Sequence, residues 1–274
     1  MDLKRPVNKQ KKKSYIFIYI ALVIIMFIPP HAEKPYLQQQ TPDVIKNLLM
    51  VVINPYVAYA PIFHIMTILL IILIILYKDK MSRIFTGYMG INYLVIGFAS
   101  SIGTTEKYGF VVFTSALVLC LIISTIWIIE TFKPKTITAF KSISPRLYFL
   151  LPLALLAFWS PVNSKIMPNF NPILLLNSPE YGLTFCLTTP VFLFLLILFY
   201  PKVNILNYKI TAFIGLEFGI LNMQWFFTPK MAWMGVLHLP LIILSLYALL
   251  LPVFSREKSA QTVDDRIILS LQNS

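Results

Sequence analysis

Charged side chains are scarce in this sequence: Asp, Glu, Lys and Arg make up 12% of its 274 residues, whereas a soluble domain has about 25%. Apolar residues make up 58% of the chain, and its mean hydropathy is +0.76. So few charges cannot cover a globular surface in water, which excludes a soluble domain, and so many apolar residues exclude a disordered chain. We therefore expect lipid to surround most of the protein.

Cysteine is nearly absent as well, and the two cysteines, Cys120 and Cys186, both lie inside apolar runs. Their spacing fits neither a metal site nor a disulfide framework, so we interpret both as small buried side chains. The sequence also lacks a P-loop, a Rossmann glycine motif, a His-Glu-x-x-His motif and a Gly-x-Ser-x-Gly elbow. We expect neither a cofactor nor a metal ion.

Long apolar segments dominate what is present. A helix needs about 20 mostly apolar residues to cross a bilayer, and the chain is predicted to be an all-α, polytopic membrane bundle of about eight such helices. One transmembrane domain covers residues 1–254, and a short polar cytoplasmic tail follows at 255–274, with a short helix at Thr262–Leu271. The stretch Pro42–Pro55 is apolar but interrupted, and it is predicted to form an interfacial helix before the second span, with Thr41 or Asp43 at its start. The eight segments are Tyr15–Pro30, Ala58–Tyr77, Ile84–Gly103, Gly109–Ile129, Leu147–Val162, Gly182–Tyr200, Ile210–Phe227 and Met231–Phe254.

The basic residues indicate the direction of these segments. The formal net charge is +12, and no basic surface is interleaved with aromatic residues as nucleic-acid sites require, so no nucleic-acid partner is expected. With the N-terminus in the cytoplasm, the cytoplasmic segments hold 18 of the 23 Lys and Arg residues. This bias predicts a cell-membrane protein with both termini cytoplasmic. One alternative is a signal peptide cleaved near Ala32, which would leave seven spans, although Pro29, Pro30 and His31 are a poor cleavage context.

Glu217 is the acidic residue that lies well inside a predicted span, and polar groups within lipid mark sites because they are costly. Gly215 and Gly219 flank it, and with Thr211 they form a ridge of small residues that allows close helix packing. Asn222 and Gln224 continue a polar stripe along the same helix. We interpret Glu217, Asn222 and Gln224 either as an ion, proton or substrate site or as polar groups that hold helices together.

His64 and His238 lie at similar predicted depths, about 10 Å below the outer surface. With Glu217 they could form a proton relay or a metal site, and the alternative is two separate histidines bonded to backbone carbonyls. Pro190, in the run Thr188-Thr189-Pro190, predicts an interruption of the sixth span, which is either a structural kink or a site-lining break. The third span is the other polar, glycine-bearing helix. We interpret its polar residues and glycines either as positions that pack against neighbouring helices or as residues that line a site, and they are Gly87, Tyr88, Gly90, Asn92 and Tyr93.

The run at Asn169–Ile197, which includes Ser-Pro-Glu-Tyr-Gly-Leu-Thr-Phe-Cys-Leu-Thr-Thr-Pro, resembles a segment of an uncharacterised prokaryotic family of multi-pass membrane proteins. In that family a Cys-Pro-Thr-Thr element opens a late transmembrane helix, and here Leu187 takes the place of the proline. The resemblance implies a small polytopic protein and transfers no catalytic residues.

Three functions fit these patterns. The first is a small transporter or channel-like protein with a protonatable intramembrane site. The second is a structural or accessory subunit of a larger membrane complex, with other membrane subunits as partners beside the lipids. The third is a membrane-embedded enzyme acting on lipid or quinone, with His64 or His238 in acid–base roles, but paired catalytic groups are lacking, so an enzyme is the weakest fit.

Overall fold

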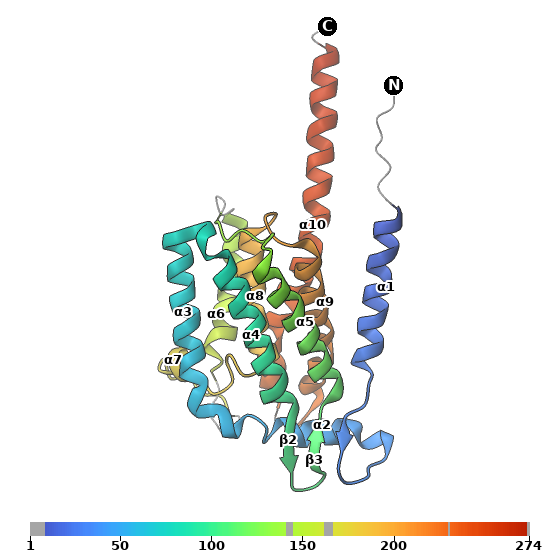
Figure 1. Ribbon diagram of the computed structural model, residues 1–274, viewed down its shortest axis with the longest axis vertical. Coiled ribbons are helices and arrows are strands. Elements are labelled where there is room, and N and C mark those ends of the chain that lie inside the picture. Colours follow the sequence, from blue (N-terminus) through green and yellow to red (C-terminus); the bar gives the residue numbers. More distant parts are fainter. Residues whose placement is uncertain (1–8, 141–144, 162–166, 230, 273–274) are drawn as a thin grey trace.

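The computed structural model describes residues 9–140, 145–161, 167–229 and 231–272, and these residues are mostly helical (Figure 1). Each of the eight predicted segments overlaps one helix, from the nine-residue α6 to the 41-residue α10, so the prediction of a helical chain is confirmed, whereas the number of spans is not. The fifth predicted segment ends at Val162, which lies outside the described residues. Five basic residues of the charge analysis also lie outside them: Lys4, Arg5, Lys141, Lys165 and Lys230. The helices are α1 (Lys9–Met26), α2 (Thr41–Leu49), α3 (Ala60–Tyr77), α4 (Ser82–Ser101), α5 (Thr114–Phe132), α6 (Leu151–Trp159), α7 (Leu174–Asn177), α8 (Phe185–Phe199), α9 (Ile205–Asn222) and α10 (Ala232–Gln272).

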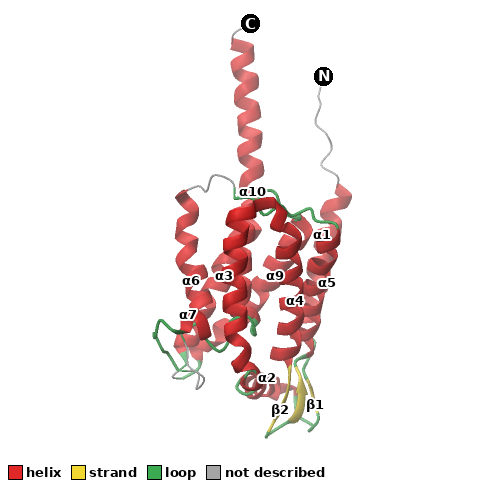
Figure 2. Ribbon diagram, turned by 60° about the vertical axis from the view of Figure 1, so that its left-hand side comes forward, coloured by secondary structure: helices red, strands yellow, loops and turns green. Residues whose placement is uncertain are grey.

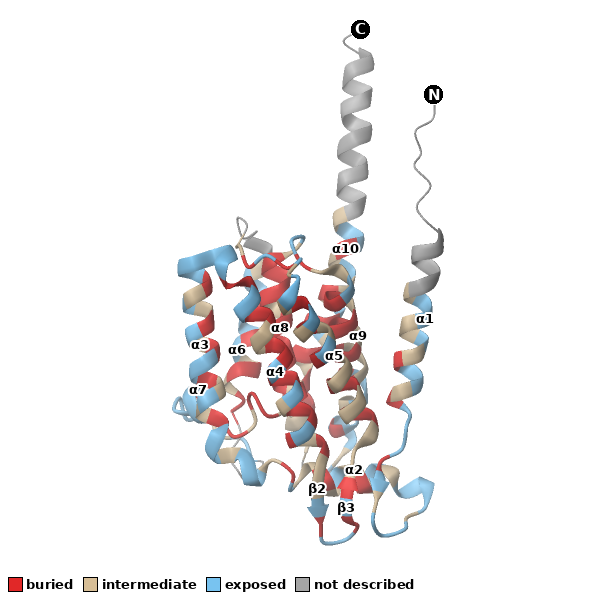
Figure 3. Ribbon diagram, in the orientation of Figure 1, coloured by how far each residue is buried: buried red, intermediate tan, exposed pale blue. Residues whose placement is uncertain are grey.

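Four helical stretches in the described part of the chain are long and apolar enough to cross a membrane. They are Gln38–Ser101, which includes both α3 and α4, then Thr114–Phe132, Ile205–Phe227 and Ala232–Ser255. Three other apolar helical stretches are shorter: Tyr15–Met26, Leu147–Trp159 and Phe185–Phe199. Large apolar side chains are exposed along the outer faces of α1 and α3, for example Phe17, Ile65 and Leu76, as expected of surfaces that face lipid (Figure 3).

Helix α8 occupies the centre of the bundle and contacts α4, α6, α9 and α10. Thirteen of its 15 residues are buried. Aromatic side chains join it to α4: Phe85 meets Phe199 with ring centroids 5.3 Å apart, and Tyr93 meets Phe192 at 5.6 Å. A helix that is apolar on all sides is expected to be enclosed by its neighbours, and this is the position of α8.

Helix α10 projects from one end of the bundle, and α1 starts at the same end and runs beside α5 and α9 (Figure 1). Helix α10 continues without a break to Gln272, so the predicted tail that starts at residue 255 begins within this helix. The predicted short helix at Thr262–Leu271 is part of the same α10.

The opposite end carries a cap that the sequence analysis found only in part (Figure 2). Helix α2 matches the predicted amphipathic segment and buries Val44 and Leu48. A three-stranded antiparallel sheet beside it was not predicted, and it is made by β1 (His31–Ala32), β2 (Ile102–Thr105) and β3 (Gly109–Val112), in the order β1-β3-β2. The predicted third and fourth spans are therefore wrong at their facing ends, where Ile102–Gly103 and Gly109–Val112 form strands.

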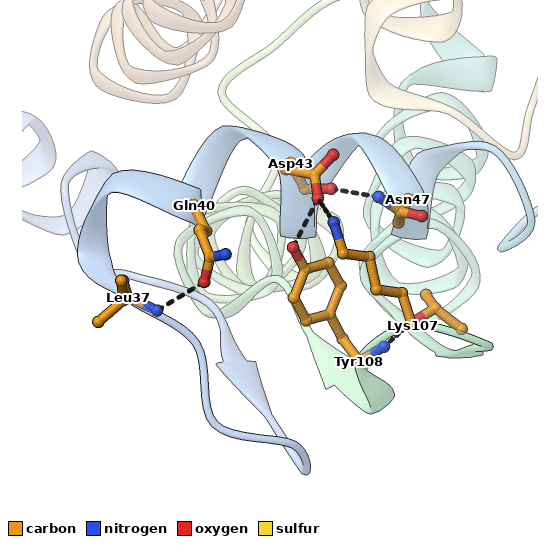
Figure 4. A network of polar contacts seen from close by, with 7 residues as sticks. Leu37, Gln40, Asp43, Asn47, Lys107 and Tyr108 are labelled. Carbon is orange, nitrogen blue, oxygen red and sulfur yellow. Dashed lines mark hydrogen bonds and ion pairs between the residues drawn. The ribbon is translucent and has the colours of Figure 1, made fainter.

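Polar contacts join α2 to the turn between β2 and β3 (Figure 4). Lys107 Nζ lies 2.6 Å from Asp43 Oδ2, and the Tyr108 hydroxyl donates to the same oxygen at 2.5 Å. Below this network, Tyr108 and Val111 pack against Val44 and Leu48. The cap is therefore a small folded unit with its own apolar contacts.

Candidate functional site

The chain between α7 and α8 packs against α3 and α4. Asn92, near the middle of α4, donates from Nδ2 to the carbonyl oxygen of Gly182 at 2.9 Å, and the Tyr181 hydroxyl donates to Thr67 Oγ1 of α3 at 3.1 Å. Leu183 packs with Ala60, the first residue of α3, and with Ala99, near the end of α4. The residues Ser178–Thr184, which we call the inserted segment, are therefore non-helical and enter the bundle from the end where α3 begins.

Gly182 makes this path feasible. Its φ is +80°, a left-handed conformation that glycine adopts without steric cost. A Cβ atom at this position would overlap Phe63 of α3. The amide of Gly182 donates to Thr188 Oγ1 at 2.8 Å, so α4 and α8 both hold the backbone of this one residue.

His64 anchors the start of the inserted segment. Its Nε2 lies 3.0 Å from the hydroxyl of Ser178, and both side chains are buried. The imidazole also contacts the rings of Phe158 and Tyr181, with both centroid distances at 4.8 Å. Nε2 of His64 therefore interacts with Ser178 at the start of the inserted segment, and this fits the interpretation of a histidine that is bonded separately from Glu217 and His238.

A chain of hydroxyl groups continues from the inserted segment. Thr67 Oγ1 accepts from Tyr181 and lies 3.0 Å from the Tyr88 hydroxyl, which donates to the carbonyl oxygen of Phe63 at 3.3 Å. Sequence reasoning considered Tyr88 and Asn92 as lining residues but missed Thr67 and Tyr181. The available signal was Thr67, a polar residue in the middle of the otherwise apolar α3.

The start of α8 is the second unusual feature. The helix begins at Phe185, and no side chain caps it, since the hydroxyl of its N-cap Thr184 donates instead to the carbonyl oxygen of Glu180 at 3.1 Å. The predicted interruption is therefore located before the helix. Pro190 itself is buried inside α8, which continues through it.

Partly exposed polar side chains surround this end of α8. Cys186 is one of two α8 residues that are not buried, and Asn222 of α9 donates to its Sγ at 3.4 Å. Asn222 also accepts from Trp225 Nε1 at 3.1 Å. Oδ1 of Asn92 has no hydrogen-bond partner among the described residues, although only 2% of Asn92 is exposed.

Glu217 lies elsewhere, on α9. Both of its carboxylate oxygens are shielded from solvent, and neither has a hydrogen-bond partner among the described residues. One turn earlier on the same face, Phe213 meets Tyr19 of α1 with ring centroids 4.4 Å apart, so Glu217 is placed on the α1 side of α9.

The predicted small-residue ridge packs as expected. A Cβ atom at Gly215 would overlap Ser245 of α10, and one at Gly219 would lie 2.5 Å from Cγ1 of Ile242. Thr211, on the same ridge, accepts a hydrogen bond from Trp127 Nε1 of α5 at 2.9 Å. Gly215, Gly219 and Thr211 therefore make the contacts of α9 with its neighbouring helices. The Glu217 carboxylate contributes no hydrogen bond to these contacts.

The remaining predicted site residues are separate. His238 Nδ1 bonds to the carbonyl oxygen of Met234, one turn earlier on α10, at 2.6 Å. Gln224 is exposed and lies in a short 3-10 turn, because α9 ends at Asn222, so the predicted polar stripe does not continue to it. Within the described ranges no three His, Cys, Asp or Glu residues lie close enough to hold a metal ion.

Glu130 is a buried acid that sequence reasoning missed, because it lies just beyond the predicted fourth span. Its Oε1 accepts from the amides of Lys135 and Thr136 at 2.6 and 2.8 Å, and its Oε2 accepts from Asn204 Nδ2 at 2.6 Å. With all these donors it joins the chain after α5 to the start of α9, which is a structural role. A cavity of about 60 Å³ beside it, lined by Phe140, Tyr200 and their neighbours, is far below the roughly 300 Å³ of a typical ligand site.

Comparison with known proteins finds no matching family model, no matching curated protein and no matching solved structure.

Proposed function

We propose that this protein crosses the cell membrane eight times with both termini in the cytoplasm, and that it is a small transporter coupled to protonation of Glu217. An even number of crossings is supported by the eight apolar helices α1, α3, α4, α5, α6, α8, α9 and α10 of the described chain, and by the location of the start of α1 and the C-terminal part of α10 at one end of the bundle. The Thr138 hydroxyl donates to the carbonyl oxygen of Lys78, and the amide of Ile137 donates to the carbonyl oxygen of Lys202. The basic loops after α3, α5 and α8 therefore meet at one end of the bundle. This gathering supports a cytoplasmic assignment for that end.

The shorter helices fit eight crossings because irregular segments extend them. Helix α6 follows a 3-10 turn at Pro145–Leu150, and α8 follows the inserted segment. Non-helical backbone at membrane depth is tolerated only where protein buries it or where it lines a cavity. Protein buries the inserted segment in this way, because the carbonyl of Gly182 accepts from Asn92 and its amide donates to Thr188.

The unpartnered carboxylate of Glu217 is the observation that carries the transport proposal. A buried polar group without a partner is costly, and an ionised one is far more so. Helix association does not explain it, because Gly215, Gly219 and Thr211 make those contacts and Glu217 donates to no described residue. A carboxyl group that exchanges a proton during each transport cycle does explain a shielded acid with no fixed partner.

The inserted segment supports transport in a second way. Helices that are interrupted at mid-height are typical of transporter binding sites, where half-helix ends face the solute. In this chain the comparable feature is the start of α8 at Phe185, which follows the non-helical inserted segment and has no side-chain cap.

The test begins with purification from native membranes in mild detergent and mass spectrometry of all bound species. The identified small molecule is then offered to proteoliposomes, with and without an imposed pH gradient. We expect gradient-driven uptake by the wild type and no gradient dependence in Glu217→Gln.

Glu106→Gln is the matched control, because Glu106 lies in the turn between β2 and β3, outside the helices. It should keep the gradient dependence. Stoichiometric protein partners without a bound small molecule would favour the accessory-subunit alternative instead. Gradient-driven uptake that persists unchanged in a folded Glu217→Gln variant would overturn the role of Glu217.

A further inference from the structure

We infer that the loops after α3, α5 and α8 together bind the headgroup of an anionic phospholipid. The turn after α3 lies at the end of the bundle from which α10 projects (Figure 1). This inference goes beyond the transport proposal and does not depend on Glu217. Four exposed lysines of these loops, which we call the basic rim, carry it: Lys78, Lys133, Lys135 and Lys202.

The loop after α5 holds the basic rim together. Its Thr138 hydroxyl donates to the carbonyl oxygen of Lys78 at 2.6 Å, and its Ile137 amide donates to the carbonyl oxygen of Lys202 at 2.8 Å. The other two lysines of the rim lie earlier in the same loop. Backbone bonds therefore fix cations from three separate parts of the chain at one place, so little loop ordering is lost when an anion binds.

The basic rim lacks an acidic partner among the described residues. Its lysines form no ion pair there, and the ion pair that is found, between Asp43 and Lys107, belongs to the cap at the other end. Two acids lie nearby in the sequence. Asp79 is exposed between two lysines, and the buried Glu130 already accepts hydrogen bonds from two amides and from Asn204. Exposed cations in such excess attract an anion.

The basic rim begins where the apolar helices end. Tyr77, the last residue of α3, directly precedes Lys78, and Phe132, the last residue of α5, directly precedes Lys133. The two aromatic side chains are 53% and 75% exposed, which suits groups at the edge of the lipid. Lysines directly beyond them lie at the level of the lipid phosphates. A phospholipid needs no enclosed cavity here, because only its headgroup contacts the rim while its acyl chains stay in the bilayer.

Lys78 occupies a backbone position that favours glycine. Its φ is +49°, a left-handed conformation that is costly for a residue with a Cβ and that glycine adopts freely. Apart from glycines, Ser160 is the one other described residue with a positive φ. A lysine that is kept in a strained conformation indicates a use for its side chain, and binding a lipid phosphate is a use that fits its position.

The experiment counts lipids bound to the full chain by native mass spectrometry in mild detergent. The probes are phosphatidylglycerol, which is anionic, and phosphatidylcholine with the same acyl chains, which is zwitterionic. We expect saturable binding of phosphatidylglycerol that weakens as salt is added, and weaker binding of phosphatidylcholine. Equal binding of the two lipids would overturn the inference. Displacement of phosphatidylglycerol by an equal concentration of inorganic phosphate would also overturn it, because the site would then take a soluble anion.

A pair of double variants tests the location of the site. Lys135→Gln combined with Lys202→Gln should weaken phosphatidylglycerol binding about 25-fold, since each lysine near an anionic surface contributes about fivefold. The matched control is Lys34→Gln combined with Lys46→Gln, which removes the same charge from exposed lysines at the cap end and should leave binding unchanged. An equal loss in both variants would show a response to net charge and would refute the basic rim as the site.

Lys78→Gly separates binding from folding. Glycine relieves the left-handed φ, so this variant should unfold at or above the Tm of the wild type while its phosphatidylglycerol binding falls about fivefold. Lys78→Arg keeps the charge and should keep the binding. Unchanged binding in Lys78→Gly, or a lower Tm, would refute the argument from Lys78. These measurements need no gradient and no uptake, so their failure would leave the transport proposal standing.

Discussion

Replacement of Gly182 by alanine should destabilise the protein strongly, because the inserted segment depends on this residue in two ways. The left-handed φ of +80° costs a residue with a Cβ about 1–2 kcal/mol. The new Cβ would also overlap Phe63 of α3, and overpacking of this kind typically costs about 1–3 kcal/mol. The two costs together are about 2–5 kcal/mol.

Thermal unfolding in detergent, followed by intrinsic fluorescence, measures this loss. A change of about 1 kcal/mol shifts Tm by about 2–4 °C in a protein of this size, so the expected fall is about 5–20 °C. Gly87→Ala is the matched control. Its Cβ would lie 3.3 Å from Cγ2 of Thr131 within a regular helix, where alanine gains up to about 1 kcal/mol of helix propensity.

The two variants should therefore separate clearly. If Gly182→Ala unfolds within about 2 °C of the wild type, a margin of less than about 1 kcal/mol, the inserted segment is not packed against α3. The packing of Ser178–Thr184 against the start of α3 would then be refuted. A similar loss in Gly87→Ala would show that the assay reports on any added methyl group.

Three further changes test other contacts. Gly219→Ala should lower Tm through overpacking against Ile242, at a cost of about 1–3 kcal/mol, and an unchanged Tm would contradict close packing of α9 on α10. Trp127→Phe removes the donor to the buried Thr211 hydroxyl and should cost about 1–3 kcal/mol, whereas Trp159→Phe, which removes a more exposed bond to Asn171, should cost less. The hydrogen bonds from Lys107 and Tyr108 lower the pKa of Asp43 below its usual 3.8, so their contribution to cap stability is present above that pH and lost as the pH falls through the lowered pKa. Amide hydrogen exchange in β2 and β3 should show this loss, and Asp43→Asn should abolish the pH dependence.

The positions of the helices could be predicted well from the sequence. The second predicted span began at Ala58 and α3 begins at Ala60, while both end at Tyr77. Hydropathy succeeds here because each long apolar run must form a helix to satisfy its own backbone in lipid. The interfacial helix was predicted from an interrupted apolar stretch with Thr41 or Asp43 at its start, and α2 does begin at Thr41.

The cap sheet escaped prediction because its strands continue the apolar runs of the adjacent helices. Phe110, Val111 and Val112 are as apolar as a transmembrane segment, and hydropathy alone assigned them to the fourth span. The turn signal was present at Gly109, whose φ is +68°. Two to four residues per strand are too few for alternation to compete with the signal of a helix.

The candidate site could be predicted only in part. Glu217 stood out because one acid in an apolar helix is conspicuous, and its lack of a partner could be learned only from the packing. Hydropathy placed the start of the sixth span at Gly182, but α8 begins at Phe185, since the carbonyl of Gly182 accepts from Asn92 of α4 and its amide donates to the side chain of Thr188.

The buried polar side chains of the bundle differ in whether structure alone accounts for them. Glu130 accepts hydrogen bonds from two backbone amides and from Asn204, and so joins two segments. Its cost in lipid is offset by these bonds, so no further role is needed to explain it. Several buried polar atoms lack a described partner, among them Nδ1 of His64, Oδ1 of Asn92 and the Tyr208 hydroxyl, but Glu217 is the one acid among these atoms of the described residues. Because an acid costs more to bury than a neutral polar group, function should be sought first at Glu217.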